Sequence, residues 1–195
     1  MERTNNIYEE YYPYLLFAIV LLVSNMLWKV SIVGDEQACA VVTLWGMDVS
    51  YYFDLAVRHL TECVYAVVHL FEPSVRFRHS SMLIFDNGNS MRIVWSCTPI
   101  KQMFIWLCIM IAAPRQSWHK CWYIPLGWVI IYGINILRIS ILTLLIYHHR
   151  SLFPLMHDYL LKYAFYLILF MMFVVYMFFS DRWKQTRNSH MPYTQ

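Results

Sequence analysis

Charged residues are scarce in this sequence: Asp, Glu, Lys and Arg make up 14% of its 195 residues, whereas a soluble domain carries about 25%. Hydrophobic residues make up 59%. These proportions argue against an ordinary soluble domain and favour an integral membrane protein. Glycine is also rare, with five in the chain, and there is no long polar block. The sequence therefore predicts a single domain over residues 1–195 with little room for linkers.

Basic clusters and cysteine motifs are missing as well. The 15 Lys and Arg residues are spread along the chain and the net charge is only +3, which argues against a nucleic-acid partner. No two cysteines have redox or zinc-finger spacing. The cysteines are Cys39, Cys63, Cys97, Cys108 and Cys121. We therefore expect no disulfide framework, no metal and no other cofactor. The lack of a His-Glu-x-x-His helix argues against an intramembrane metalloprotease.

The main feature of the chain is a series of long apolar runs. A transmembrane helix needs roughly 20 apolar residues. Four runs predict about four such helices, at 12–33, 98–113, 121–147 and 157–180. The 98–113 run is short for a full span. Basic residues follow in the tail at 181–195 and occur in the turn at 114–120, so the positive-inside rule predicts that both are cytoplasmic.

The segment 51–71 is mostly apolar but carries a charged stripe. Asp54, Arg58 and Glu62 recur every four residues, which places them on one face of a helix. Such a pattern favours an amphipathic helix at the membrane interface. The alternative is a spanning helix whose charges face the protein interior. The segment before it, 34–50, is predicted to be a short connection.

The segment 74–95 changes period. Its two ends alternate polar and apolar residues, and Asp86-Asn87-Gly88-Asn89 lies between them. Asn-Gly between alternating segments is a strong hairpin signal, and open sheet edges are not stable in lipid. The fold class predicted is thus an all-α polytopic membrane protein, with about four transmembrane helices, an interfacial amphipathic helix and a small extracytoplasmic β-hairpin.

Arg138 is the most unusual residue, because it lies near the middle of the apolar run 121–147. Inserting an arginine in a membrane helix costs at least about 2.5–3.5 kcal/mol, so such residues usually face a protein interior or a wet cavity. Asn135 lies three positions earlier, on the same helical face. The pair predicts a polar stripe with a function; the alternative is an arginine that extends to the membrane surface.

Cys97 and His157 are predicted to lie on the same side of the membrane as the C-terminal part of the helix at 121–147. With the tail inside, the runs at 98–113 and 157–180 both begin outside. Pro99 suits a first helical turn, which places Cys97 at or just before a helix N-terminus, where a thiolate is favoured. The alternative is a buried cysteine that packs as a small hydrophobe. A thiolate, an imidazole and a guanidinium together can carry out acyl transfer.

Three short motifs resemble the exosortase/archaeosortase family of multi-span membrane cysteine transpeptidases. They are Ser96-Cys97 after a short β segment, Asn135-Ile136-Leu137-Arg138-Ile139, and His157-Asp158 ahead of the last helix. The resemblance covers about residues 75–179, and the Cys, Arg and His of the family match in the same order. Thr98-Pro99 stand where the family commonly has a glycine.

The resemblance implies an enzyme that cleaves C-terminal sorting signals of exported proteins through a thioester and transfers them to a surface acceptor, a glycan or a lipid. Cys97 would be the nucleophile, Arg138 the oxyanion stabiliser and His157 the general acid/base. Asn135, Asp158 and Ser96 would support them. The site would face outward from the cytoplasmic (inner) membrane, with the substrate's hydrophobic tail and membrane lipid as partners.

Two other classes of function stay open at this point. One is a non-catalytic membrane assembly or scaffolding protein, in which Cys97 has no chemical role. The other is a carrier or channel with Arg138 as an anion site, which would need further polar residues along a path. The predicted helices supply few of these.

Overall fold

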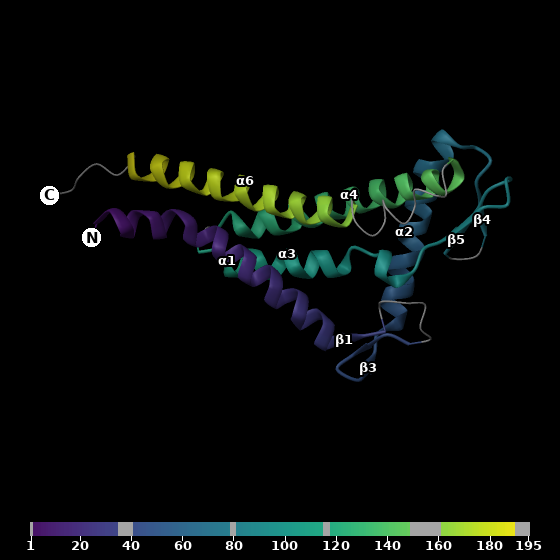
Figure 1. Ribbon diagram of the computed structural model, residues 1–195, viewed down its shortest axis with the longest axis horizontal. Helices are drawn as coiled ribbons and strands as arrows, with labels where there is room; N and C mark the ends of the chain where they lie inside the picture. The colour runs from purple at the N-terminus through teal and green to yellow at the C-terminus, as the bar shows by residue number, and fades with distance from the viewer. Residues whose placement is uncertain (1, 35–40, 79–80, 115–117, 149–160, 190–195) are drawn as a thin grey trace.

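Residues 2–34, 41–78, 81–114, 118–148 and 161–189 are described by the computed structural model of the protein. The helices are α1 (Glu2–Ser31), α2 (Ser50–Phe71), the 3-10 turn η1 (Trp95–Cys97), α3 (Ile100–Ala112), α4 (Lys120–His148) and α6 (Leu161–Ser189). The strands are β1 (Ile32–Val33), β2 (Thr43–Leu44), β3 (Met47–Asp48), β4 (Arg76–Arg78), β5 (Met82–Ile84) and β6 (Ser90–Arg92). Figure 1 shows that α1, α3, α4 and α6 form an elongated bundle, with α2 and the strands gathered at one end.

Three of these helices are long and apolar enough to cross a membrane, so this is a membrane protein by the length and composition of its helices. Within the described residues the candidate spans are Tyr11–Ser31, Lys120–His148 and Tyr163–Ser180. Many of their large apolar side chains are exposed, as Leu15, Leu22 and Met26 are on α1. A bilayer would remove that surface from water.

The fourth predicted span, 98–113, is the apolar helix α3, and it is shorter than expected. Its 13 residues extend about 20 Å at 1.5 Å per residue, less than the roughly 30 Å of a hydrocarbon core. The predicted spans at 12–33 and 157–180 agree, over the described residues, with the candidate spans Tyr11–Ser31 and Tyr163–Ser180, but the helices that contain these spans are longer. Helix α1 begins at Glu2 instead of residue 12, with Pro13 inside it. Helix α6 continues to Ser189, through part of the predicted tail.

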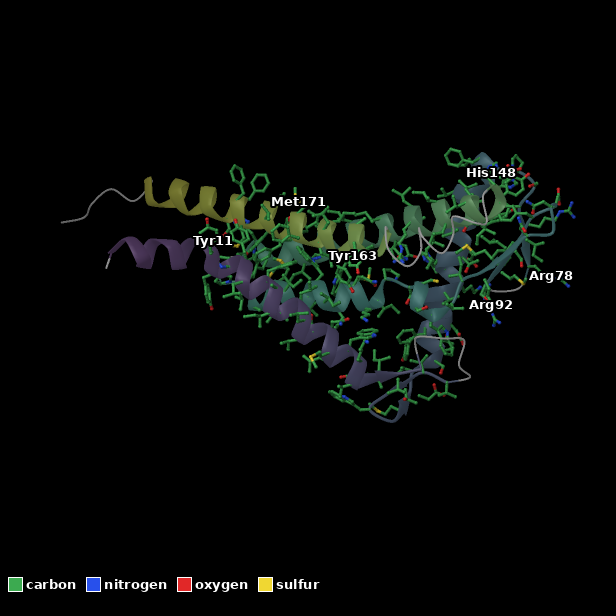
Figure 2. All side chains as sticks on the ribbon, viewed as in Figure 1. Tyr11, Arg78, Arg92, His148, Tyr163 and Met171 are labelled. Atoms are coloured by element: carbon green, nitrogen blue, oxygen red, sulfur yellow. The ribbon has the colours of Figure 1, made fainter. Side chains whose placement is uncertain are left out.

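The bundle is held together by one apolar core to which all four of its helices contribute. Trp106 of α3 and Tyr176 of α6 are fully buried there, and Phe17 of α1 packs against Phe173 of α6. Tyr123 of α4 donates a hydrogen bond to the Met172 carbonyl at 2.8 Å. Figure 2 shows side chains filling the space between these helices from Tyr11 to Tyr163.

Helix α2 is amphipathic, as its pattern predicts, and Figure 1 shows it running across the bundle helices instead of along them. Its buried residues repeat every three or four positions: Phe53, Val57, Leu60, Thr61, Val64 and Val68. The charged stripe is exposed, and Arg58 and Glu62 form an ion pair at 3.2 Å. Within the described residues α2 is not among the candidate spans, so its predicted place at the membrane interface stays a prediction.

The predicted hairpin at 74–95 is instead a three-stranded antiparallel sheet in the order β4-β5-β6. The Asn-Gly turn does connect two paired strands, but β6 pairs with β5, with Leu83 opposite Met91, and β4 is the third strand. The prediction paired the two alternating ends of 74–95 with each other, whereas β4 pairs with β5. The strands lie closer to the turn than expected, because Val94 and Trp95 have already left the sheet.

The turn between β5 and β6 also caps the C-terminal end of α4. The amide of Asn89 donates to the Ile146 carbonyl at 3.0 Å, and that of Asn87 donates to the Tyr147 carbonyl at 3.3 Å. The last carbonyls of a helix have no partner within it, so these two side chains supply one. The sheet and the second half of α4 thereby form one unit, with a core that includes Leu83, Ile139 and the buried face of α2.

The predicted plain connection at 34–50 contains secondary structure in its described part. Strands β2 and β3 form a tight hairpin, with Leu44 opposite Met47, and β1 pairs with β2. The two turn residues, Trp45 and Gly46, both have positive φ, at 50° and 84°. That geometry belongs to a hairpin turn of the primed kind. Strands this short have no alternation to detect, which is why the sequence did not reveal them.

Replacing Gly127 with alanine should destabilise the bundle. A Cβ atom there would lie 2.1 Å from Nε1 of Trp106, and the buried indole has little room to move. We expect a loss of about 1–3 kcal/mol from overpacking, measured by thermal unfolding in detergent. Gly133→Ala is the matched control in the same helix: it meets nothing within 4 Å, and it should be neutral or stabilising. Equal stability of the two variants would contradict the packing described.

Candidate active site

Cys97 is the last residue of the 3-10 turn η1, between the end of β6 and the start of α3. The turn is fixed by two contacts to the Trp95 carbonyl, from the backbone N–H of Thr98 at 3.0 Å and from its hydroxyl at 2.7 Å. Pro99 follows as the residue that precedes α3. Cys97 therefore lies just before a helix N-terminus, as predicted, although a separate turn sets it apart from the first turn of α3.

Asn135 connects this turn to α4. Its side chain is 1% exposed, and its amide Nδ2 donates a hydrogen bond to the Cys97 carbonyl at 2.9 Å. A buried amide is costly unless it is hydrogen bonded. The contact therefore fixes the backbone at Cys97 against the middle of α4. The structure thus brings together two residues that the sequence assigned to one site.

Arg138 lies one turn further along the same helix, and its positive charge acts on the Cys97 thiol. The side chain is half-buried, and its Nε atom is buried without a hydrogen-bond partner among the described residues. It also lines a small cavity of about 130 Å³ between α4 and α6, together with apolar residues that include Phe165. A guanidinium that keeps unused donors beside a thiol can bind an anion that forms there.

The environment of Cys97 does not favour a thiolate, contrary to the expectation from its position before a helix. Burial raises the pKa of the Cys97 thiol, and this outweighs the lowering by the backbone at Val94, by the charge of Arg138 and by the side chain of Ser96. The thiol is therefore protonated at neutral pH, and a reaction at its sulfur needs a base to accept the proton.

His157 and Asp158, the remaining predicted site residues, lie outside the described residues. Among the residues that the structure does describe, no three His, Cys, Asp or Glu side chains gather in a way that could hold a metal ion. The described part of the site is thus Cys97 and Ser96 on the turn, with Asn135 and Arg138 on α4.

Sequence reasoning missed a hydrogen bond that positions the turn from its other side. The indole N–H of Trp95 donates to a carboxylate oxygen of Asp54 on α2 at 2.7 Å. Asp54 was recognised only as part of the charged stripe, in which it was a neighbour for Arg58. Its actual partner is 41 residues away in the chain, a distance over which no helical periodicity carries information.

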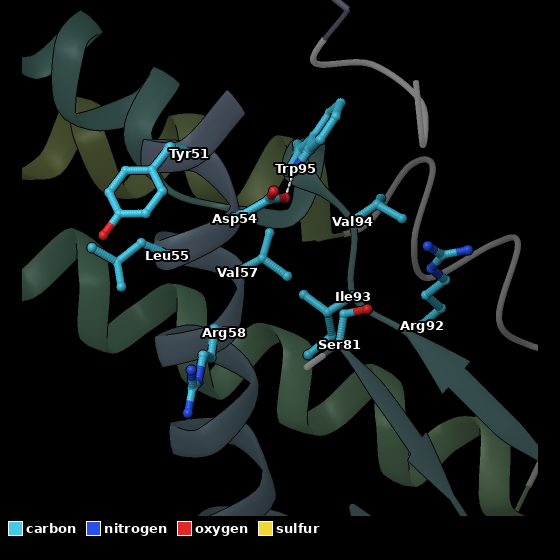
Figure 3. Close-up of a pocket in the computed structure, with 10 residues that line it drawn as sticks. All are labelled: Tyr51, Asp54, Leu55, Val57, Arg58, Ser81, Arg92, Ile93, Val94 and Trp95. Atoms are coloured by element: carbon cyan, nitrogen blue, oxygen red, sulfur yellow. Dashed lines mark hydrogen bonds between the residues drawn. The ribbon is translucent and has the colours of Figure 1, made fainter. Parts of the chain in front are cut away.

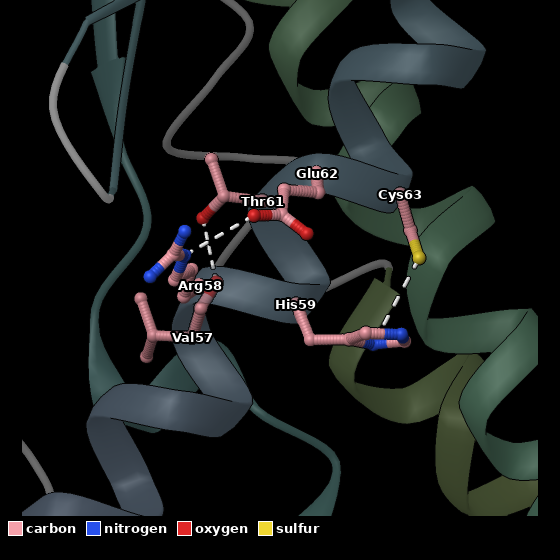
Figure 4. A network of polar contacts seen from close by, with 6 residues as sticks. All are labelled: Val57, Arg58, His59, Thr61, Glu62 and Cys63. Carbon is pink, nitrogen blue, oxygen red and sulfur yellow. Dashed lines mark hydrogen bonds and ion pairs between the residues drawn. The ribbon is translucent and has the colours of Figure 1, made fainter.

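A thiol–imidazole pair on α2 was also missed. On α2, Cys63 Sγ lies 3.9 Å from His59 Nδ1 (Figure 4), and the same nitrogen contacts the Tyr132 hydroxyl of α4. The spacing of four residues between His59 and Cys63 was a detectable signal, because residues at i and i+4 share a helical face. Here His59 connects two helices, α2 and α4.

A polar groove of about 410 Å³ lies between α2 and the segment that follows β6. Figure 3 shows Tyr51, Asp54 and Arg58 on the α2 side, and Arg92, Ile93 and Val94 on the other. Trp95 also lines the groove, and Cys97 follows two residues later. The groove thus borders the turn that carries the candidate nucleophile.

Comparison with known proteins gives no independent assignment: no protein family, curated protein or solved structure matches this chain.

Asn135→Leu should loosen the turn that carries Cys97. The substitution removes the donor to the Cys97 carbonyl, and we expect a loss of about 1–3 kcal/mol in the free energy of unfolding, measured in detergent. Ser24→Ala is the control, because the only partner of the buried Ser24 hydroxyl among the described residues is the Leu21 carbonyl of its own helix. A similar loss in both variants would mean that the hydrogen bond between α4 and η1 contributes no more to stability than one within a single helix.

The alkylation rate of Cys97 should keep rising with pH beyond the range of an ordinary cysteine, because burial raises the pKa of the thiol and only the thiolate reacts. Arg138→Gln should move the midpoint to still higher pH, since the guanidinium favours the thiolate. Arg138→Lys, which keeps the charge, should move it less. The measurement is iodoacetamide labelling followed by mass spectrometry, with the other cysteines replaced by serine. A midpoint unchanged by Arg138→Gln would show that the charge does not reach the sulfur.

Proposed function

We propose that this protein is a membrane-embedded cysteine peptidase and transpeptidase of the exosortase type, which cleaves C-terminal sorting signals of exported proteins. The observation that supports it most is the grouping of Cys97, Asn135 and Arg138. The amide of Asn135 holds the backbone of Cys97 at 2.9 Å, and the charge of Arg138 acts on the thiol. They come from two elements, η1 and α4, and belong to the motifs on which the family resemblance rests.

In the proposed reaction, His157 removes the proton from the Cys97 thiol, and the thiolate attacks the scissile carbonyl. The carbonyl oxygen becomes an oxyanion, which the Arg138 guanidinium stabilises. The intermediate collapses as the C–N bond breaks, and the imidazolium returns the proton to the departing amine. The resulting thioester on Cys97 is attacked by a nucleophile of a surface acceptor, or by water, which restores the thiol.

The proposed membrane topology follows from the basic segments. With the turn at 114–120 and the end of α6 on the cytoplasmic side, the start of α3 and the start of α6 face outward. Helix α3 is the fourth membrane crossing. Because it is shorter than the hydrocarbon core, the bilayer is thinner around it or flanking residues complete the crossing. Helix α2 then lies at the outer interface, and the catalytic residues face the extracytoplasmic side of the cell membrane.

A non-catalytic assembly or scaffolding role is the second candidate, and one observation favours it. The Cys97 thiol is half-buried with a raised pKa, as structural cysteines often are. The two candidates differ in one consequence: alkylation of Cys97 abolishes function in the first and leaves it intact in the second.

Cys97→Ala should abolish processing of an exported reporter that ends in a hydrophobic helix and basic residues. Cys108→Ala, which changes a half-buried cysteine in α3, is the control and should process normally. Arg138→Lys should reduce processing severely, since lysine lacks the planar fork that binds an oxyanion at two points. Cleavage is followed by electrophoresis, and the acyl-enzyme is identified by mass spectrometry as a hydroxylamine-sensitive adduct on Cys97. Normal cleavage by the Cys97→Ala variant would rule out the thiol mechanism.

A further inference from the structure

The register of the sheet β4-β5-β6 gathers three arginines on one of its faces. Arg78, Met82 and Arg92 lie opposite one another in one row, and Arg76, Ile84 and Ser90 form the next row on that face. The opposite face carries Leu83 and Met91, which are buried against α2 and α4. All three arginines are exposed. We call Arg76, Arg78 and Arg92 the arginine face.

Most of the charge on the arginine face is not balanced within the described chain. Arg76 contacts Asp86 across an exposed 3.6 Å ion pair. Arg78 and Arg92 have no ion pair among the described residues. They lie two strands apart, which is about 10 Å at 4.8 Å per strand. Figure 2 shows both at the end of the molecule that is distant from Tyr11.

Arg92 also connects the arginine face to the polar groove. It lines the groove together with Asp54, Arg58 and Trp95, and Figure 3 places it on the side opposite α2. A chain that crossed the arginine face could therefore enter the groove and reach the turn that ends at Cys97. The groove is also suited to a peptide backbone, because the Asp54 carboxylate and the Ser81 hydroxyl can accept hydrogen bonds from N–H groups.

We propose that the arginine face and the groove bind an acidic, extended segment of the substrate polypeptide, immediately before the bond that Cys97 attacks. This inference rests on the proposed function. In an extended peptide of the polyproline II type, side chains three residues apart lie on the same face and are separated by about 9 Å, which matches the spacing of Arg78 and Arg92. Recognition of acidic segments by grouped arginines is a recurrent mode of peptide binding. The acceptors in the groove favour a peptide over a phospholipid headgroup, which has no backbone N–H groups to donate to them.

The test uses the full-length Cys97→Ala protein in detergent, so that binding is measured without turnover. The probe is a fluorescein-labelled ten-residue Gly/Ser peptide with two Glu residues three positions apart, and its partner carries Gln in both places. Fluorescence anisotropy should show about fivefold tighter binding of the Glu peptide at low salt, as expected for two exposed charge pairs. This preference should disappear in about 0.5 M salt, where charges are screened within a few ångströms.

Arg78→Gln combined with Arg92→Gln should remove the preference for the Glu peptide. Arg76→Gln is the matched control on the same face and should reduce it less, because Arg76 already has Asp86 as a partner. Lys29→Gln, which removes one exposed charge from α1, should leave it unchanged. Equal binding of the two peptides to the unsubstituted arginine face would overturn the proposal. So would tighter, Arg78- and Arg92-dependent binding of a short-chain phosphatidylglycerol, which would make this a lipid site.

The same variants separate this inference from the proposed function when Cys97 is restored. If Cys97 forms an acyl-enzyme but the Arg78 and Arg92 substitutions leave KM unchanged, the docking proposal is wrong and the enzyme assignment stands. If the Glu peptide binds with the stated preference but no acyl-enzyme forms on Cys97, the arginine face still binds an acidic polypeptide and the catalytic assignment is wrong.

Discussion

The hydrogen bond from Asn135 to the Cys97 carbonyl is the interaction on which the arrangement of the candidate site depends. It joins a side chain that is 1% exposed in the middle of α4 to a turn that belongs to neither the sheet nor the bundle. Leucine at this position would suit the surrounding apolar core better, and the amide is tolerated there because it has a partner. The polar residue thus sets the position of η1 relative to α4, which apolar packing alone specifies only loosely.

Helix α4 serves two regions of the molecule, and this explains why a charged residue lies near its middle. Its first half packs in the bundle core around Ile131, and its second half packs against the sheet and α2 around Ile139 and Leu142. Arg138 lies where one region gives way to the other. The sequence alone presented an arginine deep in an apolar run, whereas in the fold the residue lies level with the first turns of α6, where it lines a cavity with Phe165.

The sequence predicted features that depend on local periodicity. Helices α2 and α4 begin and end within one residue of the predicted ranges, because apolar spacing and length determine them. Features that depend on distant partners were missed. The Asn-Gly turn was recognised. The hydrogen bonds from Asn87 and Asn89 to the last carbonyls of α4, 57–60 residues later, were not. The pairing of Trp95 with Asp54 and the third strand of the sheet were missed for the same reason.

The candidate site, too, has features that the sequence predicts and features that depend on the fold. Adjacent motifs were enough to select Cys97 and to place Asn135 and Arg138 on one helical face, but the protonation of the thiol depends on burial, which no motif encodes. Burial has two opposing effects here. It disfavours the thiolate, and it also strengthens the attraction between a guanidinium and any anion that forms nearby, because the local dielectric constant is lower. A thiol that stays protonated at rest, beside a charge of the kind that can stabilise an oxyanion, suits the proposed reaction, in which the nucleophile is generated only when a base and a substrate carbonyl are both in place. The same burial that makes Cys97 unreactive toward solvent is therefore compatible with acyl transfer.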